Sequence, residues 1–245
     1  MTQSTADLPL VIDAVARVLR PLRRYHRHEV HGLEHVPREG GVLVAVNHSL
    51  ASYDGFLLAL AIFEETGRIP AGLAHDRLFQ LPLIGDLVRD ANMTPASPQA
   101  GARLLREGQM VFLAPGGMRE AIRPEAERYR VSWADRLGFA RLALRTGVPV
   151  LLAACPAADD IYTVMQMPWT QAVYRRFKLP LPLAWGHRGS PLPRPVKLDH
   201  YIAPPFTPPA HDPYQEEEQV EAFHRQLVEG MQALMSANAP LTSID

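Results

Sequence analysis

Three stretches that are apolar at almost every position constrain the fold of this chain more than any other feature. They are GVLVAVN at 41–47, MVFLA at 110–114 and VPVLLAA at 148–154. A strand with one solvated face alternates apolar and polar residues, whereas a strand of a parallel sheet covered on both faces is apolar throughout. The segments between the three have the composition and spacing of helices. We therefore predict an α/β fold with a mostly parallel central sheet flanked by helices.

Further elements are expected around this sheet. Helices are predicted from about 54 to 65, within 76–91, at 98–108 and 134–147, and over the tail 216–235, which would cover the sheet. A short segment lies near 70–74, and PVKLDHYI at 195–202 predicts an edge strand within a proline-rich region. No internal repeat or linker divides the chain, so residues 28–245 are expected to form a single domain.

The N-terminal segment, residues 1–27, is predicted to be an amphipathic, basic helix. Its apolar residues follow helical spacing from Leu8 to Leu22, and arginines occupy positions 17, 20, 23, 24 and 27. Pro21 is expected to bend or end the helix near Arg20. Such a helix packs on the domain or lies on an anionic membrane, and residues 8–24 are the predicted membrane contact.

Composition restricts location and partners. No segment has the roughly 20 apolar residues of a transmembrane helix, and the N-terminus lacks the pattern of a secretory signal. We therefore expect a cytoplasmic protein, peripheral on the inner face of the membrane. With 25 basic and 26 acidic side chains the chain is nearly neutral, so its net charge would not attract nucleic acid. The single cysteine, Cys155, excludes an intrachain disulfide and is expected to be a small buried side chain.

Polar residues that could take part in catalysis or ligand binding follow two of the apolar strands. The first strand leads into Asn47 and His48, with Asp54 six positions after the histidine, and the second leads into PGGMRE at 115–120. Ligands of parallel α/β sheets bind outside the carboxyl ends of the strands. Glycines there allow close backbone approach, and arginine offers a planar fork of donors for phosphate or carboxylate.

A cluster of four histidines, HRHEVHGLEH at 26–35, raises the question of a metal site. On a strand, His26 and His28 would share one face while His31 points away, so the spacing does not favour a shared ion. We expect no metal and no bound cofactor.

The two motifs NHSLASYD and APGGMREA together resemble those of the glycerolipid acyltransferase superfamily. The similarity is closest to its diacylglycerol-acyltransferase-like and phytyl-ester-synthase-like branch, and it extends over about residues 28–206. The resemblance implies transfer of a fatty acyl group from acyl-CoA or an acyl-carrier protein to the hydroxyl of an acylglycerol, lysophospholipid or long-chain alcohol. It implies His48 as general base, oriented by Asp54. It also implies a substrate-binding set: Asn47, Pro115, Gly116, Gly117, Met118, Arg119 and Glu120.

The chain departs from the commonest family pattern in two places. Five residues separate His48 from Asp54 where four are usual, so the loop between them must bring the side chains together. Gly116 stands where the usual block has glutamate, which favours a less anionic acceptor such as a mono- or diacylglycerol. Arg123, Arg128, Arg130 and Arg136 are interleaved with acids, and a solvated mixed-charge loop is preferred there over a site for coenzyme A phosphates.

Other functions remain as alternatives. A serine hydrolase requires a G-x-S-x-G elbow, which the chain lacks. A metallohydrolase on His26, His28 and His48 lacks an H-E-x-x-H pair. A non-catalytic lipid-binding or membrane-surface protein with an acyltransferase fold stays open, as do the identity of the acceptor, the acyl-chain length, the donor and the oligomeric state.

Overall fold

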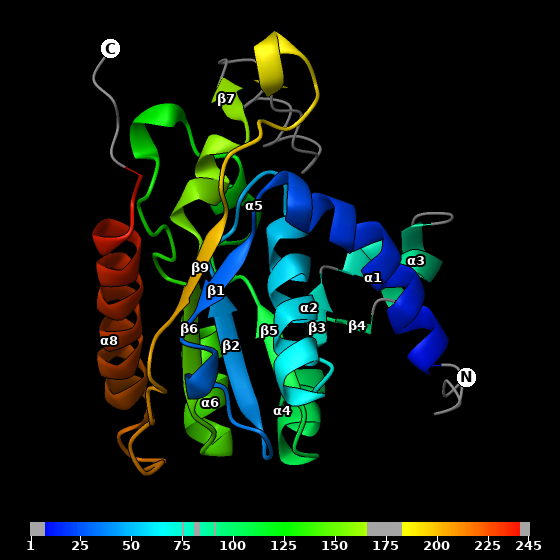
Figure 1. Ribbon diagram of the computed structural model, residues 1–245. Coiled ribbons are helices and arrows are strands. Elements are labelled where there is room, and N and C mark those ends of the chain that lie inside the picture. Colours follow the sequence, from blue (N-terminus) through cyan, green and yellow to red (C-terminus); the bar gives the residue numbers. More distant parts are fainter. Residues whose placement is uncertain (1–7, 75, 81–83, 91, 166–182, 241–245) are drawn as a thin grey trace.

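The computed structural model of the chain describes residues 8–74, 76–80, 84–90, 92–165 and 183–240. Its centre is a seven-stranded sheet in the order β1-β9-β6-β2-β5-β3-β4 (Figure 1). The strands are β1 (Glu29–His31), β2 (Val42–Val46), β3 (Ala71–Ala74), β4 (Met93–Pro95), β5 (Met110–Leu113), β6 (Val150–Ala154) and β9 (Asp199–Ile202). A separate antiparallel pair consists of β7 (Thr163–Met165) and β8 (Leu183–Trp185).

The sheet is mostly parallel, which confirms the predicted fold class. The strands from β6 through β2, β5 and β3 to β4 all run in the same direction. β9 runs antiparallel to β6, and β1 pairs in parallel with β9. The strand predicted in 195–202 therefore exists, but it is not an edge strand, because the short β1 occupies the edge beside it.

Helices connect and cover the strands. The α-helices are α1 (Leu8–Tyr25), α2 (Tyr53–Thr66), α3 (Ile84–Asp90), α4 (Pro98–Arg106), α5 (Gly117–Ala121), α6 (Gly138–Thr146) and α8 (Glu216–Ala237). Short 3₁₀ helices occupy Leu33–His35, Asp76–Gln80, Glu125–Glu127, Pro156–Asp160 and His187–Gly189. The predicted helices at 54–65, 98–108, 134–147 and 216–235 agree with α2, α4, α6 and α8 within a few residues at their ends.

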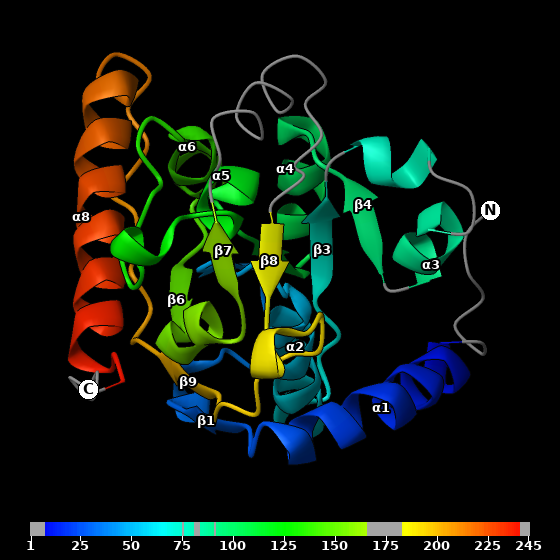
Figure 2. The ribbon, with the colours of Figure 1, turned by 90° about the horizontal axis from the view of Figure 1, so that it is seen from above.

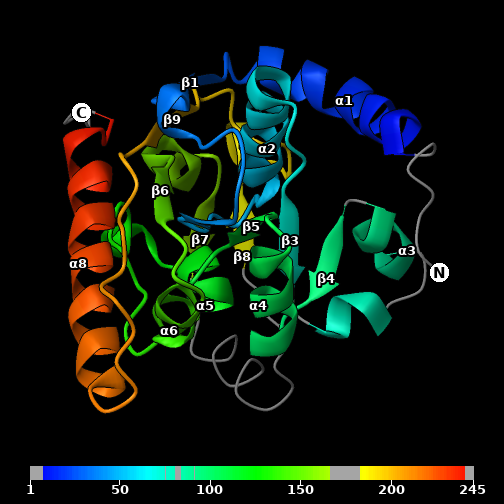
Figure 3. The same cartoon turned by 90° about the horizontal axis from the view of Figure 1, so that it is seen from below.

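The apolar strands are buried on both faces, as their composition requires. Figure 2 shows α4, α6 and α8 on one side of the sheet and α2 on the other, with α1 outside α2, and Figure 3 gives the same layers from below. Leu43 and Ala45 of β2 pack with α4, α6 and α8, whereas Val42 and Val44 pack against Leu58 of α2. Alternate residues of one strand thus enter two different apolar clusters.

α1 continues through Pro21 to Tyr25. Of the two effects expected of Pro21, a bend or an end near Arg20, the end is wrong. A proline removes only one helical hydrogen bond, and tertiary contacts hold the turns on either side of it. Leu19 is buried against α2, and Arg23 forms an ion pair with Glu64 of the same helix. The side chains of residues 8–14 lie outside the description. None of the helices within the described ranges has the length and apolarity required to cross a bilayer.

Candidate active site

Three neighbouring strands end together and deliver the candidate residues. β2 lies between β6 and β5 in the sheet and is parallel to both. The chain leaves β2 into Asn47 and His48, leaves β5 into the Pro115–Gly117 turn, and leaves β6 into Cys155 and the Pro156–Asp160 helix. The chain leaving β2 leads to β3 on one side, whereas the chain leaving β6 leads toward β9 on the other. This reversal between two neighbouring strands is where an open α/β sheet forms its ligand crevice.

The main chain of His48 is held on both sides by buried charged groups. Its N–H donates to Glu120 Oε2 at 3.1 Å, and its carbonyl oxygen accepts from Arg123 Nη2 at 2.9 Å. The second oxygen of Glu120 accepts from the N–H of Ser132 at 3.2 Å. The side chain of Glu120 is fully buried, and burial raises its pKa while Arg123 opposes that rise. His48 is therefore fixed through its backbone by the segment that follows β5.

The imidazole of His48 has a defined tautomer. Its Nδ1 lies 3.0 Å from the carbonyl oxygen of Ser49, which can only accept, so Nδ1 carries the hydrogen and Nε2 is left with a lone pair. The ring is partly buried, and burial is the main cause that lowers its pKa, with the positive charge of Arg123 adding to the effect. Both effects favour the neutral ring, the form that accepts a proton.

Asp54 lies at the start of α2 and is buried, with 2% of its surface exposed. Its Oδ1 accepts from the hydroxyl of Ser49 at 2.8 Å, and backbone N–H groups at the helix start also favour the carboxylate form. Burial outweighs these bonds and raises the pKa of Asp54. Among the hydrogen bonds of the described residues none joins Asp54 to His48. The role of Asp54 in orienting the base stays a prediction, and Ser49 is the residue between the two.

Asn47 joins the ends of β2 and β6. Its side-chain amide donates to the carbonyl of Cys155 at 3.1 Å and accepts from the N–H of Cys155 at 2.8 Å. Asn47 is 3% exposed, so its polar atoms are used within the protein. The predicted contact of Asn47 with substrate stays a prediction that this burial does not favour. Cys155 is fully buried, as expected, and burial raises the pKa of its thiol.

The second motif forms a turn and the short helix α5. Gly117 has φ +54°, a conformation that a residue with a side chain rarely adopts, and Gly116 is buried just before it. Pro115 is partly buried, whereas Met118 and Arg119 are exposed on α5 and are available to a ligand. Glu120 points inward to the main chain of His48, so a direct contact of its carboxylate with substrate is not favoured either.

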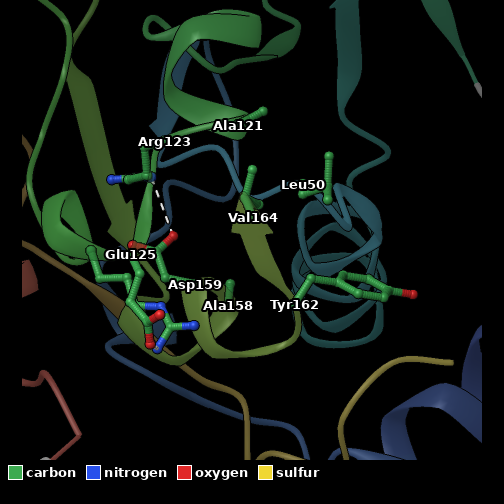
Figure 4. A pocket seen from close by; sticks show the side chains of 9 residues that line it. Leu50, Ala121, Arg123, Glu125, Ala158, Asp159, Tyr162 and Val164 are labelled. Carbon is green, nitrogen blue, oxygen red and sulfur yellow. Dashed lines mark ion pairs between the residues drawn. The ribbon is translucent and has the colours of Figure 1, made fainter. Parts of the chain in front are cut away.

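Arg123 is buried, so the prediction of a solvated mixed-charge loop is wrong for this residue. Its side chain is 4% exposed and lies 3.3 Å from Asp159 Oδ1, on the helix that follows β6. Figure 4 shows this ion pair at one side of a small pocket, with Leu50, Ala121 and Val164 on the other. The pocket has a volume of about 20 Å³, enough for about one water molecule. Burial raises the pKa of Asp159 to about 6.

The four histidines of 26–35 have separate partners. His26 contacts Tyr53 Oη and the carbonyl of Val196, and His28 Nε2 contacts His200 Nδ1 at 2.9 Å. His35 Nδ1 donates to the carbonyl of Ile202. His31 lies near Glu29 and Asp199, the one group with metal-ligand spacing found in the described ranges. Lys197 bridges both acids at 2.8 and 3.0 Å, and its ammonium group would repel a cation there.

Sequence reasoning missed Ser49, Arg123 and Asp159 as parts of this site. Arg123 follows the PGG motif by only a few residues, a signal that its acidic neighbours obscured. Asp159 lies in ADD just after a predicted apolar strand, so the rule about carboxyl ends would have found it. Ser49 is next to His48 and had no pattern of its own.

Comparisons with known proteins give a family match and several relatives. A family model described as "Acyltransferase" matches residues 27–155, more than half of the chain. The chain is 34% identical to "Uncharacterized protein Rv0502" of Mycobacterium tuberculosis over 60% of this chain and 44% of that protein. It is 26% identical to the human "DGAT1/2-independent enzyme synthesizing storage lipids" over 86% of this chain and 61% of that protein. The chain thus spans less than two thirds of the length of either relative.

A solved structure shares the fold. The 1-acyl-sn-glycerophosphate (LPA) acyltransferase PlsC from Thermotoga maritima superimposes with a TM-score of 0.59 and 19% sequence identity, over 96% of this chain and 84% of that chain. The likeness in fold extends on both sides of residues 27–155, the range that the family model matches. The family model over more than half of the chain shows that the chain belongs to the acyltransferase family, as the resemblance of its two motifs predicted.

Proposed function

We propose that this protein transfers a fatty acyl group from a thioester donor, acyl-CoA or an acyl-carrier protein, to the hydroxyl of a lipid acceptor. The observation that carries the proposal is the position of the ring hydrogen of His48. This residue lies at the carboxyl edge of the sheet, in a chain of the acyltransferase family. Its Nδ1 hydrogen is held by the Ser49 carbonyl, so Nε2 is the nitrogen that accepts a proton.

In the proposed reaction His48 acts as general base. Nε2 takes the proton of the acceptor hydroxyl as the oxygen attacks the thioester carbonyl, the C–O bond forms, and the C–S bond breaks. The proton then passes to the leaving thiolate, which restores the neutral imidazole. A base of this kind contributes roughly 10²- to 10⁴-fold to the rate. Asp54 is proposed to orient the imidazole without a direct hydrogen bond to it.

The acceptor is proposed to be a neutral lipid alcohol, such as a mono- or diacylglycerol. In the PGG turn a glycine, Gly116, stands where the family commonly has glutamate. Within residues 115–123 the cations are the buried Arg123, which is already paired with acids, and the exposed Arg119. One exposed arginine is a weak site for a phosphate dianion, which typically receives several charged donors.

The test compares His48→Ala with a control variant, His31→Ala, whose histidine is half exposed on β1. Labelled acyl-CoA is supplied with a panel of acylglycerols, lysophospholipids and long-chain alcohols, and ester products are measured by mass spectrometry. His48→Ala should lose acyl transfer by at least 10²-fold while His31→Ala keeps it. Equal product from wild type and His48→Ala would reject the proposal and leave the alternative of a lipid-binding protein without catalysis.

Peripheral attachment to the inner face of the membrane through α1 is a second part of the proposal. Ala16 and Leu19 face α2, whereas Val18 is 68% exposed beside the exposed Arg17 and Arg20. An apolar residue flanked by arginines on the outer side of a helix suits an anionic bilayer surface. This arrangement supports the predicted contact without requiring α1 to leave the domain.

The test of attachment uses a point variant, since deleting residues 8–24 would uncover apolar side chains of α2. Val18→Asp should reduce co-sedimentation with vesicles that contain anionic lipid. Tyr214→Asp is the control, because Tyr214 is 98% exposed in the loop before α8. Unchanged sedimentation of Val18→Asp, or an equal loss with Tyr214→Asp, would contradict a specific role for α1.

A further inference from the structure

Ser49 lies between the two residues assigned to the base and its orienting acid. Its hydroxyl donates to Asp54 Oδ1 at 2.8 Å, and its carbonyl accepts from His48 Nδ1 at 3.0 Å. The residue is 2% exposed. One residue thus contacts the buried carboxylate with its side chain and the imidazole with its backbone.

The turn after Ser49 keeps its peptide group in place. Ser52 donates its N–H to Ser49 Oγ at 3.3 Å and its hydroxyl to the Ser49 carbonyl at 3.1 Å. Ser52 has φ +57°, in the left-handed region that costs a residue with a side chain roughly 1–2 kcal/mol. A strained conformation persists only where the surrounding structure fixes it. Here the strained residue, Ser52, lies between His48 and Asp54. The five residues between His48 and Asp54 are accommodated by this turn.

A nucleophilic role for Ser49 does not agree with these contacts. A nucleophilic serine hydrogen-bonds the imidazole that takes its proton, whereas the Ser49 hydroxyl donates to a carboxylate. Its burial also keeps the hydroxyl away from a substrate at the surface. The geometry fits a residue that transmits the position of one group to another.

We propose that Ser49 is a positioning residue through which Asp54 fixes the orientation of the His48 imidazole, so that the acid acts on the base without touching it. This inference rests on the proposed function, since it assigns how the general base of that reaction is held. Asp54 fixes the Ser49 hydroxyl, the hydroxyl fixes the Ser49 peptide, and the peptide carbonyl holds Nδ1–H of His48.

The surroundings of Asp54 supply the rigid end of this chain of contacts. Its carboxylate is buried at the start of α2, where two backbone N–H groups favour its charge. α2 is packed between the sheet and α1 through Leu57 and Leu58. A group held by a packed helix moves less than the loop of residues 48–52, so the order of dependence runs from Asp54 to His48.

The experiment is a double-mutant cycle on acyl transfer with Ser49→Ala, Asp54→Ala and the double variant. Ser49→Ala should lower kcat roughly 10- to 100-fold, within the contribution of the base itself, and leave KM within about twofold. If Asp54 acts through Ser49, the double variant should be no slower than the slower single variant. Multiplied losses in the double variant, or a kcat of wild-type size for Ser49→Ala, would overturn the inference.

Ser49→Thr tests whether the hydroxyl itself matters, since threonine keeps the donor and should recover activity relative to alanine. The 15N chemical shifts of the imidazole supply a readout independent of turnover. Wild type should show the tautomer with hydrogen on Nδ1, and Ser49→Ala should show a mixture of tautomers, whereas a merely structural serine would lower only the melting temperature. Unaltered imidazole shifts in Ser49→Ala would also overturn the inference. An inactive wild type with the expected shift change would reject the proposed function and retain the positioning role.

Discussion

Replacing Arg123 by methionine should destabilise the protein more than almost any other single charge removal. The guanidinium group is 4% exposed and lies 3.9 Å from Glu120 and 3.3 Å from Asp159, both buried. It also donates to the carbonyl oxygens of His48, Glu120 and Arg130. Methionine fills much of the volume but leaves two buried carboxylates without a cation and three carbonyls without this donor.

The expected magnitude follows from the cost of an uncompensated buried charge. Removing one partner of a buried pair costs roughly 3–5 kcal/mol in the free energy of unfolding. For a chain of this size each kcal/mol lowers the melting temperature by about 2–4 °C, so Arg123→Met should melt roughly 10 °C lower than wild type. Urea unfolding followed by circular dichroism measures the free energy, with a melt as the second observable.

The loss of stability in Arg123→Met should depend on pH. Burial already raises the pKa values of Glu120 and Asp159, and loss of the nearby cation raises them further. The folded variant then binds protons that the unfolded chain releases, so its stability is lost as pH rises and is partly recovered as pH falls. The deficit relative to wild type should therefore be smaller at pH 5 than at pH 8.

The control is Arg103→Met, an arginine that is 61% exposed and paired with Glu107 on the surface of α4. Exposed pairs of this kind contribute about 0–1 kcal/mol. Adding Glu120→Gln and Asp159→Asn to Arg123→Met removes the unpaired charges and should recover part of the loss. A deficit for Arg123→Met no larger than that of Arg103→Met at pH 7 would refute the reasoning that these charges depend on one another.

Three further predictions concern Asp159 itself, His28 and a pair of neighbouring glycines. Because burial raises the pKa of Asp159 to about 6 from 3.8, wild type loses stability as pH rises from about 4 to 6, and Asp159→Asn should lack that loss in urea titrations. Burial lowers the pKa of His28 to about 4 from 6.5, so wild type loses stability as pH falls through this range, and acid unfolding of His28→Leu should be less steep. Gly41→Ala places a Cβ against the carbonyl oxygen of Leu105 and should cost several kcal/mol in a melt. Gly40→Ala meets no atom within 4 Å and should cost only the strain of its positive φ, roughly 1–2 kcal/mol.

The central part of the fold was predictable because its signal is local. A strand buried on both faces shows an unbroken apolar run, as at 41–47, and the helix that covers it shows its own spacing. The rule about carboxyl ends then brought 47–48 and 115–120 to one edge without any knowledge of side-chain contacts. These steps depend on neighbours in the sequence, which is why they agree with the structure.

The strand β1 and the place of β9 inside the sheet were not predictable, because both depend on partners that are distant in the sequence. β1 has only three residues, two of them exposed, so its sequence shows no apolar run. It pairs with β9, which is far away in the sequence. Nothing in 195–202 indicates that another strand will cover its outer side. The burial of Arg123, which follows β5, depends likewise on Asp159, which follows β6 on the other side of β2. The acids next to Arg123 in the sequence suggested exposure to solvent instead.

The site was predicted from residue types. The structure shows that the hydrogen bonds that hold His48 in place come from other atoms than those the sequence suggested. The His-to-Asp spacing suggested a direct pair, but a carboxylate at the start of α2 is buried beneath the turn and reaches the Ser49 hydroxyl first. Glu120, one of the two charged residues predicted to bind substrate, accepts a hydrogen bond from the backbone N–H of His48 instead. Both differences have one cause: a buried carboxylate is stable only where donors meet it, and the nearest donors here belong to the loop that bears His48. A base whose N–H, C=O and Nδ1 are all bonded to this loop and its buried neighbours has only Nε2 left for a substrate.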